Sequence, residues 1–228
     1  MSRLLASCAV GAFVALAAPA RAQVCRGQAA FGRYALQLSG SAEFGDTAKA
    51  FGAGLGLGGH RLFVETGLAR TSYDNGGGAR GTLSLDAGYA LSLDEQQLFQ
   101  FCPVVAVAFG RGPHNVNIGA GVPGNRDEVD WILGFSAGAQ TAPWSGVRVI
   151  PTVAFSVVQA RATLKDNIVG HQTSQSDSYE LLDMGLGLLL KRVTVLPGVS
   201  IPLGVDGASG TFHLTVSVKV PKKPPIIR

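Results

Sequence analysis

The chain has 228 residues, a formal net charge of +4 and a hydrophobic content of 46%, with 31 glycines. All-β domains of roughly 200–250 residues commonly fold as one unit, so a single domain is expected. The first 22 residues contain Arg3 and Arg21 and no acidic residue, so the remainder carries a net charge of only +2. The basic isoelectric point is therefore no evidence for nucleic-acid binding, and no nucleic acid is expected as a partner.

Residues 1–22 have the pattern of an export signal. Arg3 precedes an apolar stretch at 4–20, and Ala20-Arg21-Ala22 fits the small-x-small cleavage pattern. We expect cleavage before Gln23. Beyond this segment no run approaches 18 consecutive apolar residues, so the sequence predicts no transmembrane helix.

Ten segments with the two-residue periodicity of β-strands follow the predicted signal. The clearest is 211–220, where every even position is apolar and every odd position is polar. Pro103 predicts an interruption of the fifth segment, and a slip in the pattern near Val158 predicts a bulge in the seventh. The ten predicted strands are 31–44, 48–57, 61–73, 80–93, 98–110, 127–141, 147–163, 179–190, 194–203 and 211–220.

The apolar face of these strands could cover the core of a soluble sandwich or could face lipid. The connections alternate between short turns and longer polar loops, as in transmembrane barrels. The longer loops are 74–78, 111–126, 164–178 and 204–210. Aromatic residues also gather near the predicted strand ends, where transmembrane barrels carry their aromatic girdles. Both patterns favour strands whose apolar side chains face lipid.

The signal peptide, the Gly-rich alternating strands and the closing Gly210-Thr211-Phe212-His213-Leu214-Thr215-Val216 resemble the small outer-membrane β-barrel proteins of diderm bacteria. The resemblance implies an all-β fold, an antiparallel transmembrane β-barrel of about ten strands, with eight as the alternative. It implies a monomer in the bacterial outer membrane, surrounded by outer-membrane lipid and inserted by the barrel-assembly machinery. The domains are then a signal peptide at 1–22, a periplasmic lead at 23–29, the barrel at 30–220 and a basic, Pro-rich periplasmic tail at 221–228. Members of this group usually end on an aromatic residue, whereas this chain ends on Arg228.

Cys25 and Cys102 are the two cysteines that survive the expected cleavage. An oxidising compartment favours a disulfide between them, with two independent thiols as the alternative. The expected topology brings both to the periplasmic mouth of the barrel. No Cys/His spacing fits a metal site, and no cofactor motif is present, so neither metal nor cofactor is expected.

Ionisable residues occur on the polar faces of the predicted strands. A narrow barrel interior is filled largely by side chains, and unpaired charges there are costly. We therefore expect an ion-paired network that plugs the lumen, with a narrow pore for small solutes as the alternative. His213 is expected as a hydrogen-bonded interior residue. The predicted network is Arg33, Arg61, Glu65, Arg80, Asp86, Asp130, Arg148 and Asp183.

No catalytic motif is present, so the sequence does not predict an enzyme. The hydrolase alternative would need His114 or His171 to gather with Asp127, Glu128 or Asp130 at the outer mouth. We favour the hypothesis of a structural or surface-interaction role. Under this hypothesis, loops 111–126 and 164–178 form the contact surface for an extracellular ligand.

Overall fold

The computed structural model describes residues 24–27, 35–59, 61–74, 78–93, 98–113, 116–117, 123–141, 143, 145–166, 172–205 and 208–220. Arg33, His114, His171, the signal at 1–22 and the tail at 221–228 lie outside the described residues, so the expectations for them stay predictions. Within the described part of the chain, no helix is long and apolar enough to cross a membrane.

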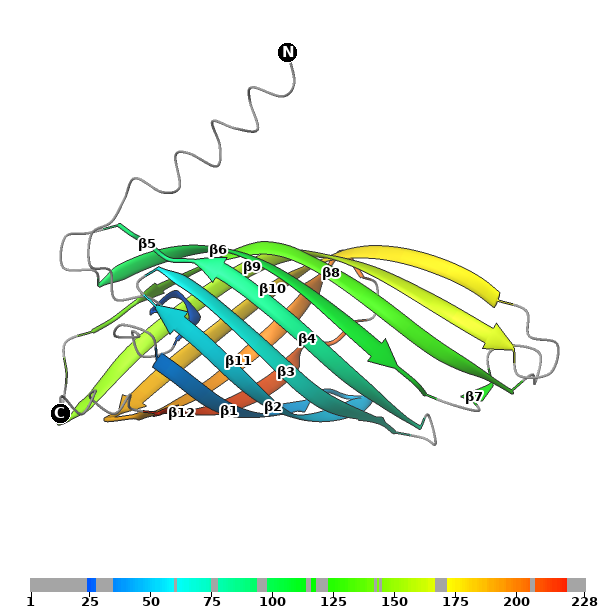
Figure 1. Cartoon of the computed structure of the whole chain (residues 1–228), viewed down its shortest axis with the longest axis horizontal. Coiled ribbons are helices and arrows are strands. Elements are labelled where there is room, and N and C mark those ends of the chain that lie inside the picture. Colours follow the sequence, from blue (N-terminus) through cyan, green and yellow to red (C-terminus); the bar gives the residue numbers. More distant parts are fainter. Residues whose placement is uncertain are drawn as a thin grey trace, which may run out of the picture.

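Ten long strands form an antiparallel barrel, and two strands of two residues each flank it (Figure 1). A short 3-10 helix, η1 (Val24–Arg26), precedes them. The strands are β1 (Ala35–Phe44), β2 (Ala48–Gly59), β3 (Leu62–Tyr73), β4 (Ala79–Tyr89), β5 (Leu91–Ser92), β6 (Phe99–Arg111), β7 (Val116–Asn117), β8 (Pro123–Ala139), β9 (Val147–Asp166), β10 (Gln172–Leu190), β11 (Val193–Leu203) and β12 (Thr211–Val220).

Pairing between the first and last strands closes the sheet into a ring. β1 pairs with β12 from Leu36 opposite Val220 to Phe44 opposite Phe212, and β6 pairs with β8 along its full length. Every long strand therefore has a neighbour on both sides, at least over its central part. This confirms a closed barrel of ten long strands, and the eight-stranded alternative and the soluble sandwich are wrong.

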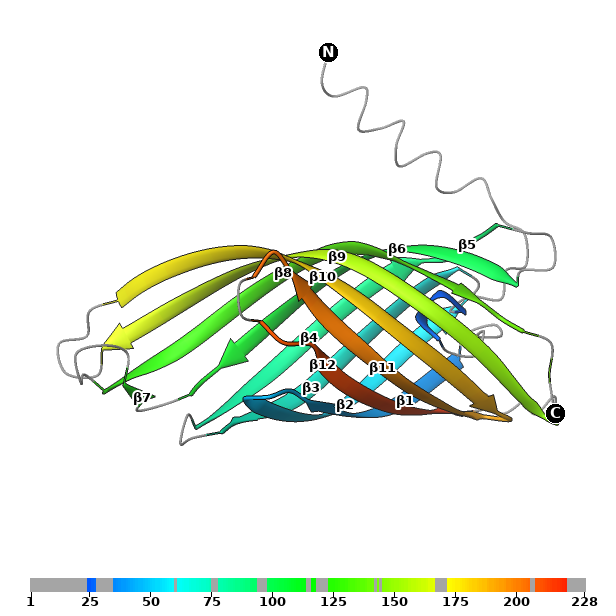
Figure 2. The ribbon, with the colours of Figure 1, turned by 180° about the vertical axis from the view of Figure 1, so that it is seen from behind.

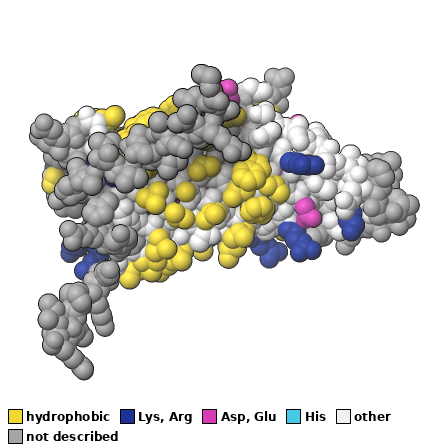
Figure 3. Space-filling view, turned by 45° about the horizontal axis from the view of Figure 1, so that its top comes forward, with side chains coloured by type: hydrophobic (Ala, Val, Ile, Leu, Met, Phe, Trp, Pro, Cys, Tyr) yellow, Lys and Arg dark blue, Asp and Glu magenta, His cyan; other side chains and the backbone are white. Residues whose placement is uncertain are grey.

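The barrel presents its apolar residues outwards. On β12 Phe212, Val216 and Val218 are 46%, 40% and 43% exposed, whereas the intervening Ser217 is 4% exposed and faces the lumen. Leu133 of β8 is 69% exposed and Leu68 of β3 is 65% exposed. Figure 3 shows hydrophobic side chains gathered in a band on the face of the barrel that it presents. A surface of this kind requires lipid rather than water around it.

Two irregularities predicted from the sequence have different outcomes. Pro103 does lie within β6, opposite Phe135 of β8, but pairing on its other side is interrupted between β4 and β5. A proline has no N–H to donate to that neighbour. The predicted bulge near Val158 is wrong, because β9 keeps one register with both β8 and β10. Val158 is 2% exposed and points inwards. An apolar residue on the inward face breaks the alternation in the sequence without any change of register.

The two long loops are also shorter than predicted. β8 already begins at Pro123, β9 continues to Asp166 and β10 starts at Gln172, so much of 111–126 and 164–178 is strand. These residues are polar on both faces and lack the apolar alternation that identifies a strand in lipid. Figures 1 and 2 show β8, β9 and β10 extending beyond the other strands at the end of the barrel opposite η1. We call this the far end, and the end that holds η1 the near end.

The lipid-facing wall generates a first prediction. Leu133 lies midway along the outward face of β8, so Leu133→Arg should lower the free energy of unfolding by about 2–4 kcal/mol in vesicles. Thr163→Arg on β9, beyond the apolar belt, should lower it by less than about 1 kcal/mol. Urea titration of the reconstituted protein measures both. Equal losses would contradict a bilayer around this part of the wall.

Candidate functional site

The near end of the lumen is occupied by a piece of main chain. Val24 and Cys25 are each 1% exposed, and Cys25 forms a disulfide with Cys102 of β6, which is fully buried. The disulfide predicted from the sequence is therefore confirmed. Cys102 faces the lumen, so this bond carries the segment 24–27 into the barrel rather than holding it outside the mouth.

The barrel wall is shaped to receive this segment. A Cβ atom at Gly138 of β8 would overlap the backbone of Val24, and one at Gly187 of β10 would overlap the backbone of Gly27. The Val24 N–H donates a hydrogen bond to Gln100 Oε1 at 3.0 Å. The Val24 side chain packs with buried Ile150 and Leu189. Close packing, a buried hydrogen bond and a covalent bond together fix the segment against four strands, β6, β8, β9 and β10.

Arg26 brings a positive charge into the near part of the lumen. Its Nη1 lies 3.2 Å from Glu65 Oε2 of β3, and its guanidinium carbon lies 5.2 Å from the ring centroid of Phe63. Glu65 also accepts a hydrogen bond from the Ser39 hydroxyl at 3.2 Å. The segment thus supplies the counter-ion for a carboxylate that would otherwise face the lumen unpaired.

A second charged cluster lies nearer the far end. Arg80 of β4 forms an ion pair with Glu128 of β8, and its Nη2 lies 3.6 Å from Asp130 Oδ2. Arg126 approaches Glu128 from the same strand, at 3.5 Å. Two arginines therefore balance two carboxylates. Such mutual neutralisation is what a narrow interior requires of its charges.

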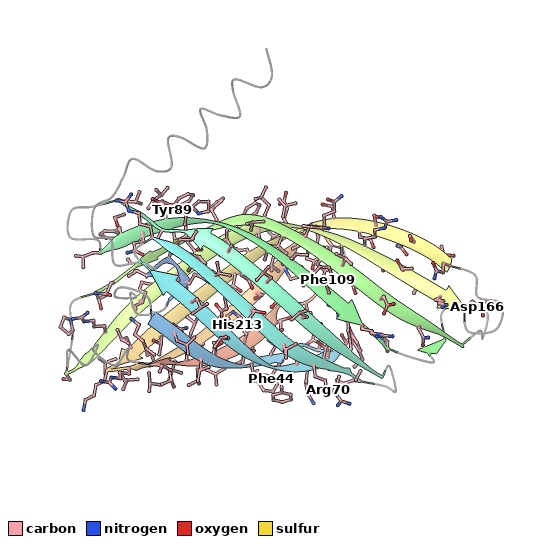
Figure 4. The ribbon with its side chains drawn as sticks, viewed as in Figure 1. Phe44, Arg70, Tyr89, Phe109, Asp166 and His213 are labelled. Carbon is pink, nitrogen blue, oxygen red and sulfur yellow. A yellow bond between two sulfur atoms is a disulfide. The ribbon has the colours of Figure 1, made fainter. Side chains whose placement is uncertain are left out.

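A third cluster joins the last three strands. Asp183 of β10 accepts a hydrogen bond from the Ser200 hydroxyl of β11 at 2.5 Å, and its Oδ2 lies 3.2 Å from His213 Nε2 of β12. His213 is thus an interior residue with a carboxylate partner, as expected (Figure 4). A carboxylate between a hydroxyl and an imidazole is a structural link. The serine proton points to the carboxylate and not to the histidine, so no activated nucleophile results.

A cavity of about 450 Å³ remains between the first and third of these clusters. Four carboxylates and two basic side chains line it, so its wall is acidic. Among the described residues, no group of three or more His, Cys, Asp or Glu side chains could hold a metal ion. The charged lining residues are Arg26, Glu43, Glu65, Asp86, Asp183 and His213.

The single network predicted from the sequence is divided. Glu65 and Asp86 lie with Arg26, Arg80 lies with Asp130, and Asp183 lies with His213. Arg61 lies apart at the near end, where Nη1 donates to the Tyr89 hydroxyl at 3.5 Å. Arg148, half-buried on β9, makes no ion pair with a described residue.

Arg26 is the residue that sequence reasoning missed. Its signal was present, because the alternation along the strand places Cys102 on the inward face, between Gln100 and Val104. A cysteine bonded to an inward residue must itself enter the lumen, and the next residue must follow it. The disulfide therefore excludes the predicted position of residues 24–27 in a lead outside the barrel.

Comparison with known proteins agrees with this architecture. No protein-family model and no curated protein matches the sequence. The translocator domain of autotransporter NalP from Neisseria meningitidis matches the structure with a TM-score of 0.52 and 15% identity, over 82% of this chain and 87% of that one. The chain has the outer-membrane β-barrel fold.

Two further outer-membrane barrels match over most of their length. Neisserial surface protein A (NspA) gives a TM-score of 0.39 at 15% identity, over 82% of this chain and 97% of that one. The N-terminal barrel domain of Pseudomonas aeruginosa OprF gives 0.36 at 12% identity, over 82% and 98%.

The disulfide generates a second prediction. Cys25 and Cys102 are separated by 77 positions in the sequence, so the bond should stabilise the fold by about 4 kcal/mol through loss of chain entropy in the unfolded state. Cys25→Ser, Cys102→Ser and the double variant should therefore show the same loss in urea titration. A double variant much less stable than either single variant would mean that the thiols act separately.

Proposed function

We propose that this protein is a non-enzymatic outer-membrane barrel, closed at its periplasmic end, that presents the far-end strands at the cell surface for binding. The fold supports a location in the outer membrane. β1 starts and β12 ends at the near end, which supports a near end that faces the periplasm. The observation that carries the proposal is the ribbon formed by the extended parts of β8, β9 and β10.

The ribbon is longer than a membrane crossing needs. About 9–11 tilted residues cross a bilayer. β1 and β12 have 10 residues each, whereas β9 has 20 and β10 has 19. From Gln172 to Ser178 every residue of β10 is exposed, so this stretch stands free of the barrel on both faces.

One edge of the ribbon has no strand partner among the described residues. β10 pairs with β9 from Gln172 onwards, but its pairing with β11 begins only at Glu180. Residues 172–179 therefore offer backbone N–H and C=O groups on that side, and none of them is a proline or a lysine that would block strand addition. An extended polypeptide is the partner that such an edge suits, because it can add a strand by main-chain hydrogen bonds.

A narrow cation-preferring pore is the second candidate. The cavity of about 450 Å³ and its excess of carboxylates favour it. The segment 24–27 argues against it, since it lies across the near end under covalent and close-packed restraint. A hydrolase is not proposed, because Asp127 faces outwards whereas Glu128 and Asp130 are engaged by Arg80.

The display role generates a third prediction. In intact cells, a membrane-impermeant maleimide should label Ser176→Cys on the ribbon and should not label Lys191→Cys in the near-end turn. Ser176 and Lys191 are both exposed, so both variants should be labelled in the purified protein, which provides the control. Labelling confined to Lys191→Cys would reverse the proposed orientation and remove the ribbon from the cell surface.

The closed near end generates a fourth prediction. The native protein should give no steady conductance in planar bilayers. Combining Cys25→Ser with Gly187→Leu removes the bond and fills the space of Gly27, so this variant should conduct, with a preference for cations set by the acidic wall. Steady conductance of the native protein would favour the pore instead.

A further inference from the structure

The barrel wall carries two arginines on either side of a glycine at the far edge of its apolar band. Arg70 of β3 lies opposite Gly81 of β4, and Gly81 lies opposite Arg111 of β6. Register partners share a face, so all three positions point outwards, and both arginines are exposed. The two arginine-bearing strands lie about 10 Å apart, with β4 between them.

Gly81 leaves a notch between the arginines. A Cβ atom built at this glycine would have no other atom within 4 Å, so the wall is open there. Two guanidinium groups beside an open main-chain strip can converge on one anion. Planar guanidinium forks suit phosphate oxygens in particular.

The next outward row towards the near end is apolar. Leu68, Leu83 and Phe109 are register neighbours on the same three strands, and their exposed fractions are 65%, 47% and 49%. Each lies two residues from its partner in the arginine row. A molecule that occupied both rows would have an anionic head and an apolar tail, which is the chemistry of a membrane lipid.

Arg70 and Arg111 form no ion pair with a described residue. Asp127 of β8 is the register neighbour of Arg111 on the side away from Gly81, and Phe51 of β2 is that of Arg70. The notch is thus bounded by one carboxylate and one aromatic ring. Figure 3 shows basic side chains beside the edge of the hydrophobic band, and Figure 4 labels Arg70 and Phe109.

We propose that Arg70, Gly81 and Arg111 form a binding site for the phosphate group of a lipid in the leaflet at the far end, with its acyl chains on Leu68, Leu83 and Phe109. The identity of that leaflet as the outer one rests on the proposed function. Recognition of the phosphate does not, since it depends only on the wall. A phosphorylated glycolipid meets both requirements, because its phosphate lies at the headgroup level.

Retention of lipid by the purified protein tests this site. The purified full chain is reconstituted in phosphatidylcholine vesicles that contain lipid A, an acylated disaccharide with two phosphates, and bound lipid is counted by native mass spectrometry. Lipid A should be retained, and its dephosphorylated form should not. Arg70→Gln and Arg111→Gln should each weaken retention by about fivefold. Asp127→Asn should strengthen it, because it removes the neighbouring carboxylate.

Two further variants separate a built notch from diffuse attraction. Gly81→Phe keeps both charges but fills the notch, so it should weaken retention as much as loss of one arginine. Arg161→Gln on β9 removes an equally outward, exposed arginine away from the notch and should leave retention unchanged. An unchanged Gly81→Phe variant, or an equal loss with Arg161→Gln, would overturn the site.

Competition with inorganic phosphate identifies the source of the anion. Free phosphate should not displace lipid A, because it cannot use the apolar row. Displacement would mean that the notch is a general anion site and would overturn the lipid assignment. Surface labelling of Ser176→Cys tests the orientation separately, so failure of the proposed function and failure of this site give different results.

Discussion

The need to satisfy every backbone hydrogen bond without water determines most of this structure. In lipid an unpaired N–H or C=O costs several kcal/mol, so a spanning sheet must close on itself. The pairing of β1 with β12 and of β6 with β8 provides that closure. Once the ring is closed, successive side chains along each strand face lipid and lumen in turn. The interruption opposite Pro103, where β4 gives way to β5, is tolerated at the near end of the wall.

Closure also determines how charged side chains can be placed in the interior. A ring of ten strands leaves a narrow lumen, so each inward charge needs a partner close by. The barrel meets this demand with three separate clusters around Glu65, Glu128 and Asp183 rather than with one network. For Glu65 the partner comes from outside the strands. Arg26 follows Cys25, which is bonded to Cys102, so one covalent bond both holds main chain in the near end of the lumen and places the counter-ion of Glu65.

Beyond the bilayer, the strands no longer need a protein partner for every backbone group. Water can satisfy both their faces and their free edges, so β9 and β10 continue as a polar ribbon, and residues 172–179 have no described strand partner on one side. At the boundary between the two regimes, register places an arginine row directly beside an apolar row. The arrangement of Arg70, Gly81 and Arg111 follows from three strands crossing that boundary at the same level. The proposed display surface and the proposed lipid site both lie where strands pass the edge of the apolar belt.

The sequence by itself determined the class of fold, the ten strands and which face of each meets lipid, because alternation along a strand is a local property. Its errors fall where that local signal ends. Residues 172–178 are polar on both faces, so their pattern predicts a loop where β10 has a strand, and Val158 is an apolar residue that faces inwards. The disulfide was predictable, but the entry of Arg26 into the lumen needed the direction of Cys102 to be followed one step further. Which charges meet was decided by tertiary structure alone, since Arg80 and Glu128 lie 48 positions apart and meet only through strand register around the closed ring.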